Sequence, residues 1–385
     1  MNIGTVKEIK NNETRVGITP DNAKKLTESG HTVLIEKDAG KEAGYEDDAY
    51  IFKGATIATK EEIFRTSDII VKVKEPMPEE YPYLELMKGK TLYTFLHLAA
   101  ADKQLTLELL KNRITGIAYE TVTDENNRLP LLSPMSEIAG VLATQYGAQY
   151  LQKKYNGKGI TLGNITGAPQ THVVIIGGGT AGAKAAETSG GLGSNVTLLE
   201  LNETRIEQLK EKFKTRENIT IIKSTPDTLR DTVKTADLLI GAVLVPGNIA
   251  PTVITEDMVR SMEKGTVLID IAIDQGGCIW ASRPTSHDDP TYEIDGKIYC
   301  CITNMPGQVP HQSTKALTSA TIKYLKIMAD TGIHELITQD KNFRNGINTI
   351  DGRLTNKAVA EALELEYTPV EEVLSIDRPE NINTY

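Results

Sequence analysis

Side chains able to bind an anion or move a proton follow three predicted elements in the first third of the chain. Arg15 lies between the first predicted strand and the first predicted helix, Lys74 follows a strand predicted over 68–73, and His97 follows a strand predicted over 91–96. Because the carboxyl ends of parallel strands lie at one edge of a sheet, we expect these side chains at the same edge. Arginine and lysine together can bind a carboxylate, and histidine exchanges protons near neutral pH.

Each of these side chains also has a purely structural interpretation. Arg15 would pair with Glu13 or Glu8 on the surface, and each lysine would mark a solvated strand end. Strand alternation places Lys72 and Lys74 on the same face of the strand. His97 would be a hydrogen-bonded structural histidine. The recurrence of cationic or titratable residues at one sheet edge favours the functional interpretation.

A glycine-rich turn predicts a nucleotide site in the middle of the chain. The segment 171–182 reads THVVIIGGGTAG, an apolar run that ends in Gly177, Gly179 and Gly182 before a predicted helix. Glycine permits the sharp turn, and its missing Cβ lets the backbone approach a pyrophosphate. The N-terminus of the next helix directs free N–H groups at that phosphate. The alternative is a turn that only packs a helix on a sheet.

Glu200 is the acidic residue expected of such a unit. It ends a strand predicted over 196–200, eighteen residues after Gly182. A carboxylate there accepts hydrogen bonds from the adenosine ribose and repels a 2′-phosphate. Strand, turn, helix and acid together indicate a dinucleotide site, and the acid favours NAD over NADP as the cofactor.

Two further apolar runs end in turns of the same region. The run over 237–247 is a buried strand entering a turn, and its end is expected beside the nicotinamide or its ribose. The run that begins at Val267 carries Asp270 within it and Asp274 beyond it, in a glycine-flanked turn. Asp270 is expected to hydrogen-bond backbone. Asp274 is the better candidate to face a ligand, and the alternative is an aspartate that caps a loop.

The order of predicted elements places the chain in the α/β class. Strands are expected over 2–5, 32–36, 68–73, 91–96, 114–118, 171–176, 196–200, 219–222, 237–242, 266–271 and 299–303. Helices are expected from Thr19-Pro20 to Gly30, from Thr59 to Ser67, and over 102–113, 133–154 and 313–330. Residues from about Glu371 are expected to form a polar terminus.

Strands separated by helices predict parallel sheets covered on both faces. We expect two Rossmann-like, doubly wound domains joined by the long helices, with the active site in the cleft between them. The substrate domain is expected to be discontinuous, residues 1–131 plus 309–385, and the NAD-binding domain to comprise residues 132–308.

Composition limits the classes of partner. The 385 residues are many for one core, and a net charge of -10 argues against nucleic acid or an anionic membrane as partner. Cys278, Cys300 and Cys301 form a poor disulfide framework and lack the spacing of a zinc site, so we interpret them as small buried hydrophobes. Because residues 1–8 contain no apolar signal core, a cytoplasmic location is expected.

Several segments together resemble the alanine dehydrogenases, relatives of the NAD-binding subunit of proton-translocating transhydrogenase. The resemblance runs from residue 1 to about 374. Its segments are Lys10–Val16 (KNNETRV), Lys72–Pro76 (KVKEP), Thr94–Ala100 (TFLHLAA), Ser133–Gly140 (SPMSEIAG), Gly241–Gly247, Asp270–Gly277 and Asn304–Pro306 (NMP).

The resemblance implies roles for individual residues. Arg15 and Lys74 would bind the substrate carboxylate and carbonyl, and His97 and Asp274 would be the catalytic pair. Cofactor-binding positions would be Ser136, Gly177, Gly179, Thr180, Ala181, Gly182, Glu200, Arg205, Ser224, Val243, Leu244, Ile271, Ala272, Ile273, Asp274, Arg283, Ile302, Thr303, Asn304 and Met305. The family commonly has Asp where this chain has Glu200, and the longer acid is still expected to reach the ribose.

The expected activity is reversible oxidative deamination of L-alanine to pyruvate and ammonia, with hydride transfer to NAD. Sequence does not divide the proton transfers between His97 and Asp274. The family is usually a homohexamer, and some members carry a metal in the long C-terminal helix. The matching positions here, Ile327 and Thr331, cannot bind one, so no metal is expected. The alternatives are a transhydrogenase-like NAD-binding subunit and a non-catalytic dinucleotide-sensing module.

Overall fold

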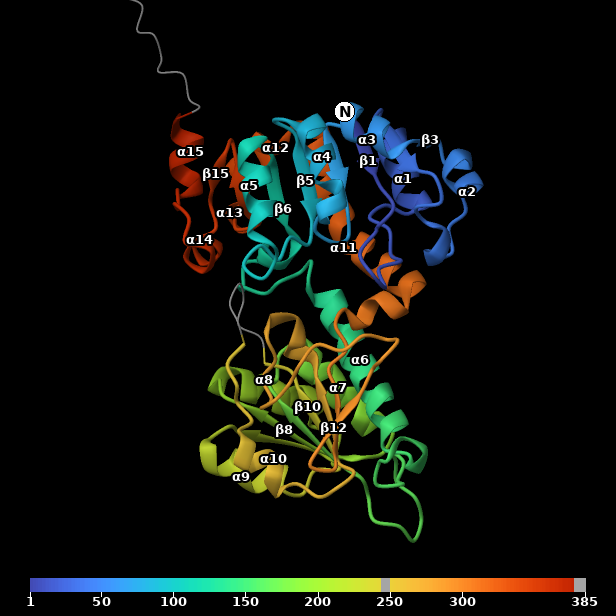
Figure 1. The fold of residues 1–385 in the computed structure, drawn as a ribbon, viewed down its shortest axis with the longest axis vertical. Coiled ribbons are helices and arrows are strands. Elements are labelled where there is room, and N and C mark those ends of the chain that lie inside the picture. Colours follow the sequence, from blue (N-terminus) through green and yellow to red (C-terminus); the bar gives the residue numbers. More distant parts are fainter. Residues whose placement is uncertain (244–249, 377–385) are drawn as a thin grey trace, which may run out of the picture. The chain divides into compact units, whose positions relative to one another are not determined.

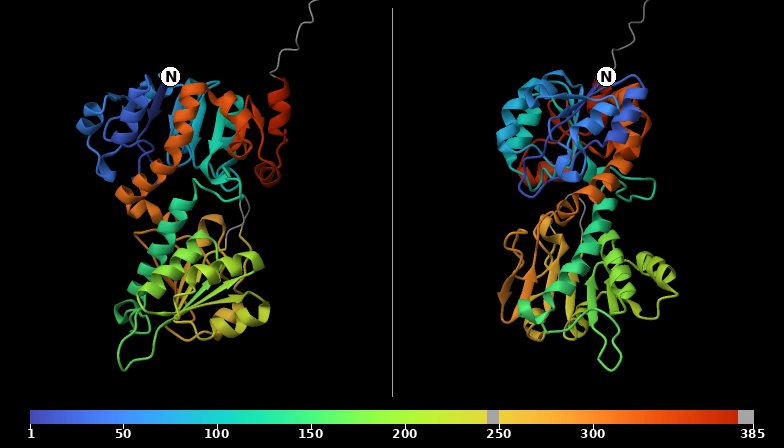
Figure 2. Two further views of the ribbon diagram at one scale, coloured as in Figure 1. Left: turned by 180° about the vertical axis from the view of Figure 1, so that it is seen from behind. Right: turned by 90° about the vertical axis from the view of Figure 1, so that its right-hand side faces the viewer.

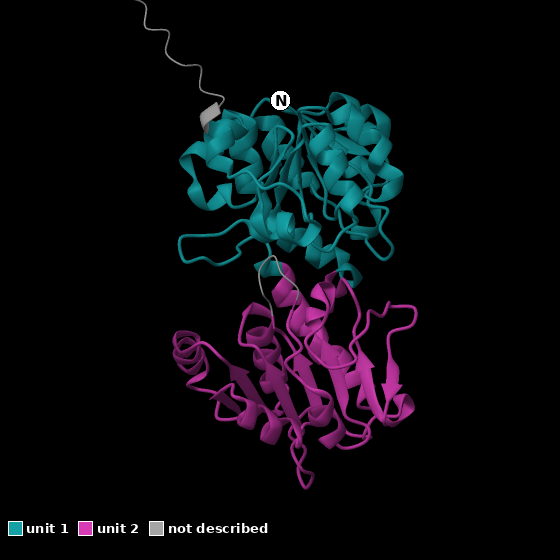
Figure 3. Ribbon diagram, turned by 60° about the vertical axis from the view of Figure 1, so that its left-hand side comes forward, with its two compact units in different colours: residues 1–134, 307–385 teal, residues 135–306 magenta. Residues whose placement is uncertain are grey.

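The computed structural model describes residues 1–243 and 250–376. These residues form two compact units (Figures 1 and 3). Unit 1 contains residues 1–134 and the chain from 307 onward, and unit 2 contains residues 135–306. Each unit is built around one β-sheet with helices packed against it (Figure 2). The predicted α/β class with two parallel-sheet domains is confirmed.

The sheet of unit 1 has the strand order β15-β14-β6-β5-β4-β1-β2-β3. Its strands are β1 (Asn2–Thr5), β2 (Thr32–Glu36), β3 (Thr56–Ala58), β4 (Ile69–Val71), β5 (Thr91–Thr94), β6 (Thr115–Ala118), β14 (Ile347–Ile350) and β15 (Arg353–Leu354). The strands from β3 to β6 are parallel, whereas β14 pairs antiparallel with β6 and β15 antiparallel with β14. The order reverses direction between β1 and β4, the type of position where open α/β sheets bind ligands.

The helices of unit 1 connect these strands. They are α1 (Pro20–Glu28), α2 (Asp47–Phe52), α3 (Lys60–Thr66), α4 (Tyr81–Leu84), α5 (Lys103–Lys111), α11 (Pro310–Thr331), α12 (Ile333–Gln339), α13 (Lys341–Arg344), α14 (Lys357–Leu363) and α15 (Val370–Ile376), with 3-10 turns η1 (Lys41–Ala43), η2 (Pro78–Glu80), η3 (Glu85–Met87) and η4 (Tyr119–Thr121). Thr19 caps α1 by accepting a hydrogen bond from the Asn22 backbone, and Pro20 opens its first turn, as the sequence predicts.

The long helix α11 returns the chain to unit 1 and packs against its N-terminal segments. The Val16 backbone N–H donates to Thr314 Oγ1 at 3.2 Å, and the Asn22 side chain donates to the Thr318 carbonyl at 3.2 Å. Within the described ranges, no helix combines the length and the apolar character needed to cross a membrane.

The sheet of unit 2 has the order β12-β13-β11-β10-β7-β8-β9, with β10 at its centre. Its strands are β7 (His172–Ile176), β8 (Asn195–Glu200), β9 (Ile219–Lys223), β10 (Leu238–Gly241), β11 (Val267–Asp270), β12 (Tyr292–Ile294) and β13 (Lys297–Cys300). Its helices are α6 (Ser133–Tyr150), α7 (Thr180–Gly191), α8 (Glu203–Phe213), α9 (Pro226–Val233) and α10 (Glu256–Ser261), and its 3-10 turns are η5 (Lys153–Tyr155), η6 (Ile271–Gln275) and η7 (Met305–Gln308). All pairs are parallel except β12 with β13.

Some predicted boundaries were wrong for local reasons. The helix predicted to Lys154 ends at Tyr150, and a turn closed by Asn156 at φ 65° follows it. The strand predicted over 68–73 ends at Val71. Of the stretch from Glu371 that was predicted to be a polar terminus, residues 371–376 lie in α15, where Val373 is buried. Four short strands, β3, β12, β14 and β15, were not predicted.

Replacing Gly140 in α6 with alanine should lower the melting temperature, because the added Cβ would lie 2.3 Å from the Ala181 carbonyl oxygen of α7. Such overpacking typically costs about 1–3 kcal/mol. Gly191→Ala in α7, where a Cβ meets nothing within 4 Å, is the matched control and should leave the melting temperature unchanged or raise it. Equal melting temperatures for the two variants in a calorimetric scan would contradict this account of the α6–α7 contact.

Candidate active site

The carboxyl ends of four neighbouring strands of unit 1 carry the polar residues of the candidate site. β1 pairs with β4, β4 with β5, and β5 with β6, all in parallel, so these strand ends lie at one edge of the sheet. Arg15 follows β1, Lys74 follows β4, and His97 follows β5. The structure therefore places the three predicted substrate-site residues of this unit on adjacent connections at one sheet edge.

Arg15 is buried, with 2% of its surface exposed, and is paired with an equally buried acid. Its Nε donates to Glu13 Oε1 at 2.7 Å, and its Nη2 reaches Glu13 Oε2, so the carboxylate engages two donors of the guanidinium. The Arg15 backbone N–H donates to the same Oε1 at 3.0 Å. The pairing with Glu13 considered as a surface alternative is thus present, but it is buried, and it fixes the plane of the guanidinium.

Lys72 lies in a fully buried ion cluster with two glutamates. Its Nζ donates to Glu8 Oε2 at 3.0 Å and to Glu80 Oε1 at 3.1 Å. Burial by itself lowers the pKa of Lys72, but the two carboxylates raise it above its ordinary value. Burial raises the pKa of Glu8, and the neighbouring carboxylates of Glu13 and Glu80 add to this rise, whereas Lys72 opposes it. Lys72 is therefore a structural residue and not a solvated strand end.

Lys74, two residues after Lys72, is also buried but is not part of the ion cluster. It is 7% exposed, and its ammonium makes no ion pair or hydrogen bond within residues 1–243 and 250–376. Its backbone is fixed on both sides: the N–H lies 3.4 Å from Glu8 Oε1, and the carbonyl accepts from Thr94 Oγ1 at 3.0 Å. A largely desolvated cation attracts anions strongly, and the charge of Lys74 already acts on the neighbouring Glu75 carboxylate.

Glu75 is a buried carboxylate among cations. Lys10 Nζ lies 2.5 Å from its Oε1, and its Oε2 is buried without a hydrogen-bond partner in the described part of the chain. Burial alone would raise the pKa of Glu75. The charges of Lys74, Lys10 and His97 outweigh that effect and hold the pKa below its ordinary value. Glu75 is therefore an anion close to these cations.

His97 occupies a left-handed backbone conformation with φ 46° and is partly exposed. Its backbone N–H donates to Glu120 Oε1 at 2.6 Å, and the Leu96 N–H lies 3.2 Å from the same oxygen. The imidazole is parallel to the Phe95 ring, with a 5.6 Å centroid separation and an interplanar angle of 2°. Its backbone and its ring are thus both held by neighbouring groups.

The glycine turn of unit 2 links β7 to α7. A Cβ on Gly177, which has φ 98°, would lie 2.6 Å from the Ala242 carbonyl oxygen, and a Cβ on Gly182 would lie 1.9 Å from the Gly177 carbonyl oxygen. These two positions therefore require glycine for backbone packing. Gly179 caps α7, and a Cβ there would meet nothing within 4 Å, so the helix N-terminus at Thr180 and Ala181 is open to a ligand.

Glu200 at the end of β8 closes onto this turn. Its Oε2 accepts from the Gly178 backbone N–H at 2.7 Å, and its Oε1 accepts from the Leu201 and Asn202 N–H groups at 2.8 Å each. Arg205 Nε donates to the Gly178 carbonyl at 2.7 Å. The carboxylate is thus held in place beside the glycine turn by backbone donors.

The two aspartates that follow β11 have different environments. Asp270 is fully buried and accepts from the Ala272, Cys278 and Ile279 backbones and the Ser282 hydroxyl at distances from 2.6 to 3.0 Å. Burial raises its pKa. Asp274 is exposed, and its Oδ1 lies 3.3 Å from the Asn304 backbone nitrogen. The expectation that Asp270 hydrogen-bonds the backbone is confirmed. Asp274, being exposed, is available to a bound molecule.

The remaining predicted cofactor positions lie after other strands of unit 2 or in α6. Ile271, Ala272 and Ile273 lie in η6 with Asp274; Ile302, Thr303, Asn304 and Met305 follow β13; Ser224 follows β9; Val243 follows β10; Ser136 lies in the first turn of α6; and exposed Arg283 stacks on Tyr292 at 4.2 Å. Leu244 lies outside the described residues. Ser136 and Arg283 are therefore the two that do not directly follow a strand of the sheet.

Neither a metal centre nor a reactive cysteine is indicated by the described residues. Within residues 1–243 and 250–376, no three His, Cys, Asp or Glu side chains are arranged to hold a metal ion. Cys278, Cys300 and Cys301 are buried and form no disulfide, and burial raises the pKa of each thiol. A raised pKa disfavours the nucleophilic thiolate.

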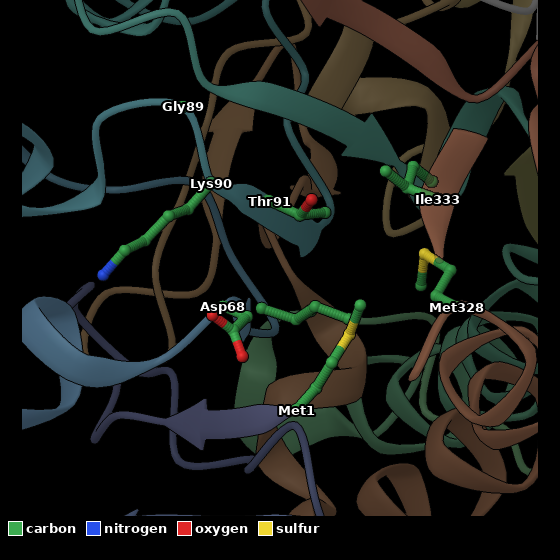
Figure 4. A pocket seen from close by; sticks show the side chains of 8 residues that line it. Met1, Asp68, Gly89, Lys90, Thr91, Met328 and Ile333 are labelled. Carbon is green, nitrogen blue, oxygen red and sulfur yellow. The ribbon is translucent and has the colours of Figure 1, made fainter. Parts of the chain in front are cut away.

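A cavity of about 190 Å³ in unit 1 lies away from these residues (Figure 4). It is lined by Met1, Asp68, Ile69, Gly89, Lys90, Thr91, Met328 and Ile333. Most of these residues precede or begin β1, β4 and β5 and so lie at the amino ends of the strands. The candidate residues lie at the carboxyl ends, so this cavity is not part of the candidate site.

From the sequence, no role was assigned to Glu75 or Glu120, and Glu13 and Glu8 were considered only as surface partners of Arg15. Glu120 comes two residues after β6, so the rule that selected Lys74 and His97 would have found it. Glu75 directly follows Lys74 in sequence. No sequence signal identifies Glu8 as the partner of Lys72, because that contact depends on side-chain packing between separate loops.

Known protein families and individual relatives match this chain over nearly its whole length. Family models described as "Alanine dehydrogenase/PNT, N-terminal domain" and "Alanine dehydrogenase/PNT, C-terminal domain" match residues 4–139 and 143–357. A protein named alanine dehydrogenase from Staphylococcus haemolyticus (strain JCSC1435) is 47% identical over 378 residues, covering 98% of this chain and 100% of the relative. Alanine dehydrogenase 2 from Staphylococcus aureus (strain USA300) is 47% identical over 377 residues, with the same coverage.

Solved structures of similar proteins superpose on nearly the whole chain. A structure named L-alanine dehydrogenase superposes with a TM-score of 0.88 at 43% identity, covering 94% of this chain and 99% of that one. A transhydrogenase from Sinorhizobium meliloti superposes with a TM-score of 0.78 at 21% identity, covering 92% and 100%, and shows the shared fold alone. Fold, glycine turn and relatives define a two-domain α/β dehydrogenase. The chain belongs to the alanine dehydrogenase/PNT family, and the resemblance inferred from sequence is confirmed.

Lys72→Met should destabilise the protein by about 3–5 kcal/mol, because Glu8 and Glu80 would remain buried without their cation. The Glu8 pKa is already raised by burial and would rise further, so the folded state binds protons more tightly than the unfolded state. The loss should therefore be largest at neutral pH and shrink as the pH falls toward the ordinary glutamate value of about 4.3.

Lys111→Met is the control for this prediction, because Lys111 lies on the surface with its side chain 59% exposed. Denaturant unfolding of both variants at several pH values provides the measurement. A pH-independent loss in Lys72→Met, or an equal loss in Lys111→Met, would refute the role given to the buried cluster.

Proposed function

We propose that the protein catalyses reversible oxidative deamination of L-alanine to pyruvate and ammonia, with NAD as hydride acceptor. The observation that carries this proposal is 47% identity with alanine dehydrogenases over 98% of the chain. The residues at the carboxyl ends of both sheets supply the chemical groups that the reaction needs. The reaction requires the groups of unit 1 and the cofactor held by unit 2 to act on one substrate.

Arg15 and Lys74 bind the carboxylate and the carbonyl of the substrate. The Arg15 guanidinium is already oriented by Glu13, so little rotational freedom is lost when a carboxylate binds. Lys74 is 7% exposed, so the field of its ammonium is weakly screened by water. In the direction of reductive amination, Lys74 polarises the pyruvate carbonyl. Fixing both groups sets the Cα hydrogen in one orientation and removes much of the entropic barrier.

His97 and Asp274 carry the proton transfers. The imidazole exchanges a proton with the amine or with the carbinolamine oxygen, and the exposed Asp274 carboxylate helps activate water and stabilises the iminium cation. Asp270 takes no part, because its carboxylate is buried and engaged by four donors.

The glycine turn and Glu200 fit a dinucleotide. Gly177 and Gly182 leave no room for a Cβ, whereas Gly179 opens onto free space at the N-terminus of α7, where a pyrophosphate fits. Glu200 accepts from backbone donors beside this turn and places a negative charge where a 2′-phosphate would bind. When bound, NAD supplies the hydride-accepting nicotinamide. Ser136, Arg205, Ser224, Val243, Arg283 and the segments 271–274 and 302–305 complete the binding surface, and Leu244 keeps its predicted contact role.

The transhydrogenase-like reading is not favoured, because the alanine dehydrogenase structure is 43% identical to this chain and the transhydrogenase structure 21%. A homohexamer is proposed from the family resemblance, and the cytoplasmic location stays a prediction. L-alanine, pyruvate and ammonia are the proposed small-molecule partners, without nucleic acid or membrane.

Purified protein should form NADH, measured at 340 nm, with L-alanine as the preferred member of a panel of amino acids. Because Glu200 repels the 2′-phosphate, NADP should support a much lower kcat/KM than NAD. Turnover with no amino acid but with a second nucleotide would favour transhydrogenation. Tight NAD binding without any turnover would favour a sensing module, and either result would overturn the proposal.

Lys74→Met should lower kcat/KM for L-alanine by roughly 10²–10³-fold, the usual cost of losing one preorganised electrostatic donor. NADH affinity, measured by fluorescence quenching, should not change, because Lys74 lies in unit 1 and the glycine turn in unit 2. Lys24→Met, an exposed lysine paired with Glu28 in the same unit, is the control and should retain wild-type kinetics. Wild-type kinetics in Lys74→Met would remove Lys74 from the substrate site.

A further inference from the structure

The carboxylate of Glu120 contacts the backbone and approaches the ring of His97. Glu120 lies in η4, which begins directly after β6, and β6 is the parallel neighbour of the strand that leads to His97. Its Oε1 accepts from the His97 backbone N–H at 2.6 Å and from the Leu96 N–H at 3.2 Å, and its Oε2 lies 3.3 Å from the Leu96 nitrogen. One side chain therefore holds the two consecutive amide groups at the end of β5.

This contact sustains an unfavourable backbone conformation at His97. A φ of 46° is uncommon for a residue with a side chain, and such conformations persist only where surrounding contacts determine them. The His97 carbonyl is also fixed, since it accepts from the Ala100 and Ala101 backbones at 2.9 Å each. The strained residue is thus held on its N–H side by Glu120 and on its carbonyl side by the following turn.

The ring of His97 lies near the same carboxylate. His97 Nδ1 lies 3.8 Å from Glu120 Oε1, while the Phe95 ring lies parallel to the imidazole and fixes its plane. The distance is longer than a hydrogen bond, and apo forms of catalytic sites often show contacts that shorten when substrate binds. With Nδ1 directed at a carboxylate, the proton of a neutral imidazole resides on Nδ1, and the Nε2 lone pair remains for the substrate.

We propose that Glu120 is a positioning residue for the reaction: it fixes the His97 backbone, directs Nδ1 toward itself and leaves Nε2 as the nitrogen that exchanges the proton with substrate. This inference rests on the proposed role of His97. It adds Glu120 to the proposed pair His97 and Asp274 as the group that orients the base, in the way that carboxylates orient histidines in other acid–base sites. The Glu120 side chain is 11% exposed, so its interaction with His97 is only partly screened by water.

Glu120→Gln tests the inference, because glutamine keeps the length and one carbonyl acceptor for the backbone N–H groups but removes the charge that faces Nδ1. We expect kcat for alanine oxidation to fall roughly ten- to hundredfold, within the 10²–10⁴-fold that acid–base catalysis contributes. The KM for L-alanine and the affinity for NADH should change less than threefold, about the error of such comparisons. Glu120→Asp, which keeps the charge, should recover part of the lost kcat.

Glu36→Gln is the matched control. Glu36 ends β2 in the same sheet, and its Oε2 accepts a backbone N–H, that of Lys7, at 2.8 Å, but it does not contact His97. If the role of Glu120 were only to hold a loop, both glutamine variants should behave alike, with small changes in melting temperature and unchanged kcat.

A double-mutant cycle with His97→Asn separates this inference from the proposed function. If Glu120 acts through His97, adding Glu120→Gln to His97→Asn should cost no further activity. Wild-type kcat in His97→Asn would overturn the proposed role of His97 itself. An inactive His97→Asn with a fully active Glu120→Gln, or multiplicative losses in the double variant, would overturn the positioning role of Glu120 and leave the proposed function intact.

Discussion

The Glu8 carboxylate is the contact on which the substrate edge of unit 1 depends. It lies just after β1, yet its oxygens accept from the Lys72 ammonium and from the Val73 backbone at the end of β4. The chain after one strand is thereby tied to the chain after its neighbour. Lys72 is engaged in this buried cluster, whereas the ammonium of the next lysine, Lys74, makes no ion pair or hydrogen bond within the described residues and has only the Glu75 carboxylate as an acidic neighbour in the motif. Of the two lysines in this motif, Lys72 therefore stabilises the fold, whereas Lys74 is the one proposed to bind substrate.

The two units hold their candidate site residues in place with different kinds of groups. In unit 1, charged side chains fix one another at the strand ends: Arg15 is held by Glu13 and His97 by Glu120. In unit 2, backbone groups hold the acidic side chains: Glu200 accepts hydrogen bonds from three backbone N–H groups, and Asp270 also accepts from three. Side-chain pairs suit a small charged substrate, and a rigid backbone surface suits a large cofactor whose phosphates need many N–H donors.

Much of this arrangement could be predicted from the sequence, for identifiable reasons. The strands at 2–5 and 32–36 were predicted with correct ends, and Thr19 was predicted as the cap of α1, because strong local signals define them. The glycine turn was found because the spacing of its glycines, between an apolar run and a predicted helix, is visible in the sequence. The partner of Arg15 was predicted only as an alternative and those of Lys72 and His97 not at all, because the pairing of charges depends on how separate loops pack against one another. The different roles of Lys72 and Lys74 were hidden, since alternation does not apply once β4 has ended at Val71.

The sheet of unit 1 is completed by the end of the chain, and this has a consequence for how the protein is made. β14 pairs antiparallel with β6, and Thr349 Oγ1 accepts from the Gly116 backbone at 3.1 Å, across more than two hundred residues of sequence. During synthesis, the segment 135–306 emerges from the ribosome as a continuous unit and can fold before β14 exists. Until then β6 is an open, apolar strand edge, which is the kind of surface that pairs with other nascent chains. The burden on chaperones should therefore fall on the first 134 residues, although they are the first to be translated.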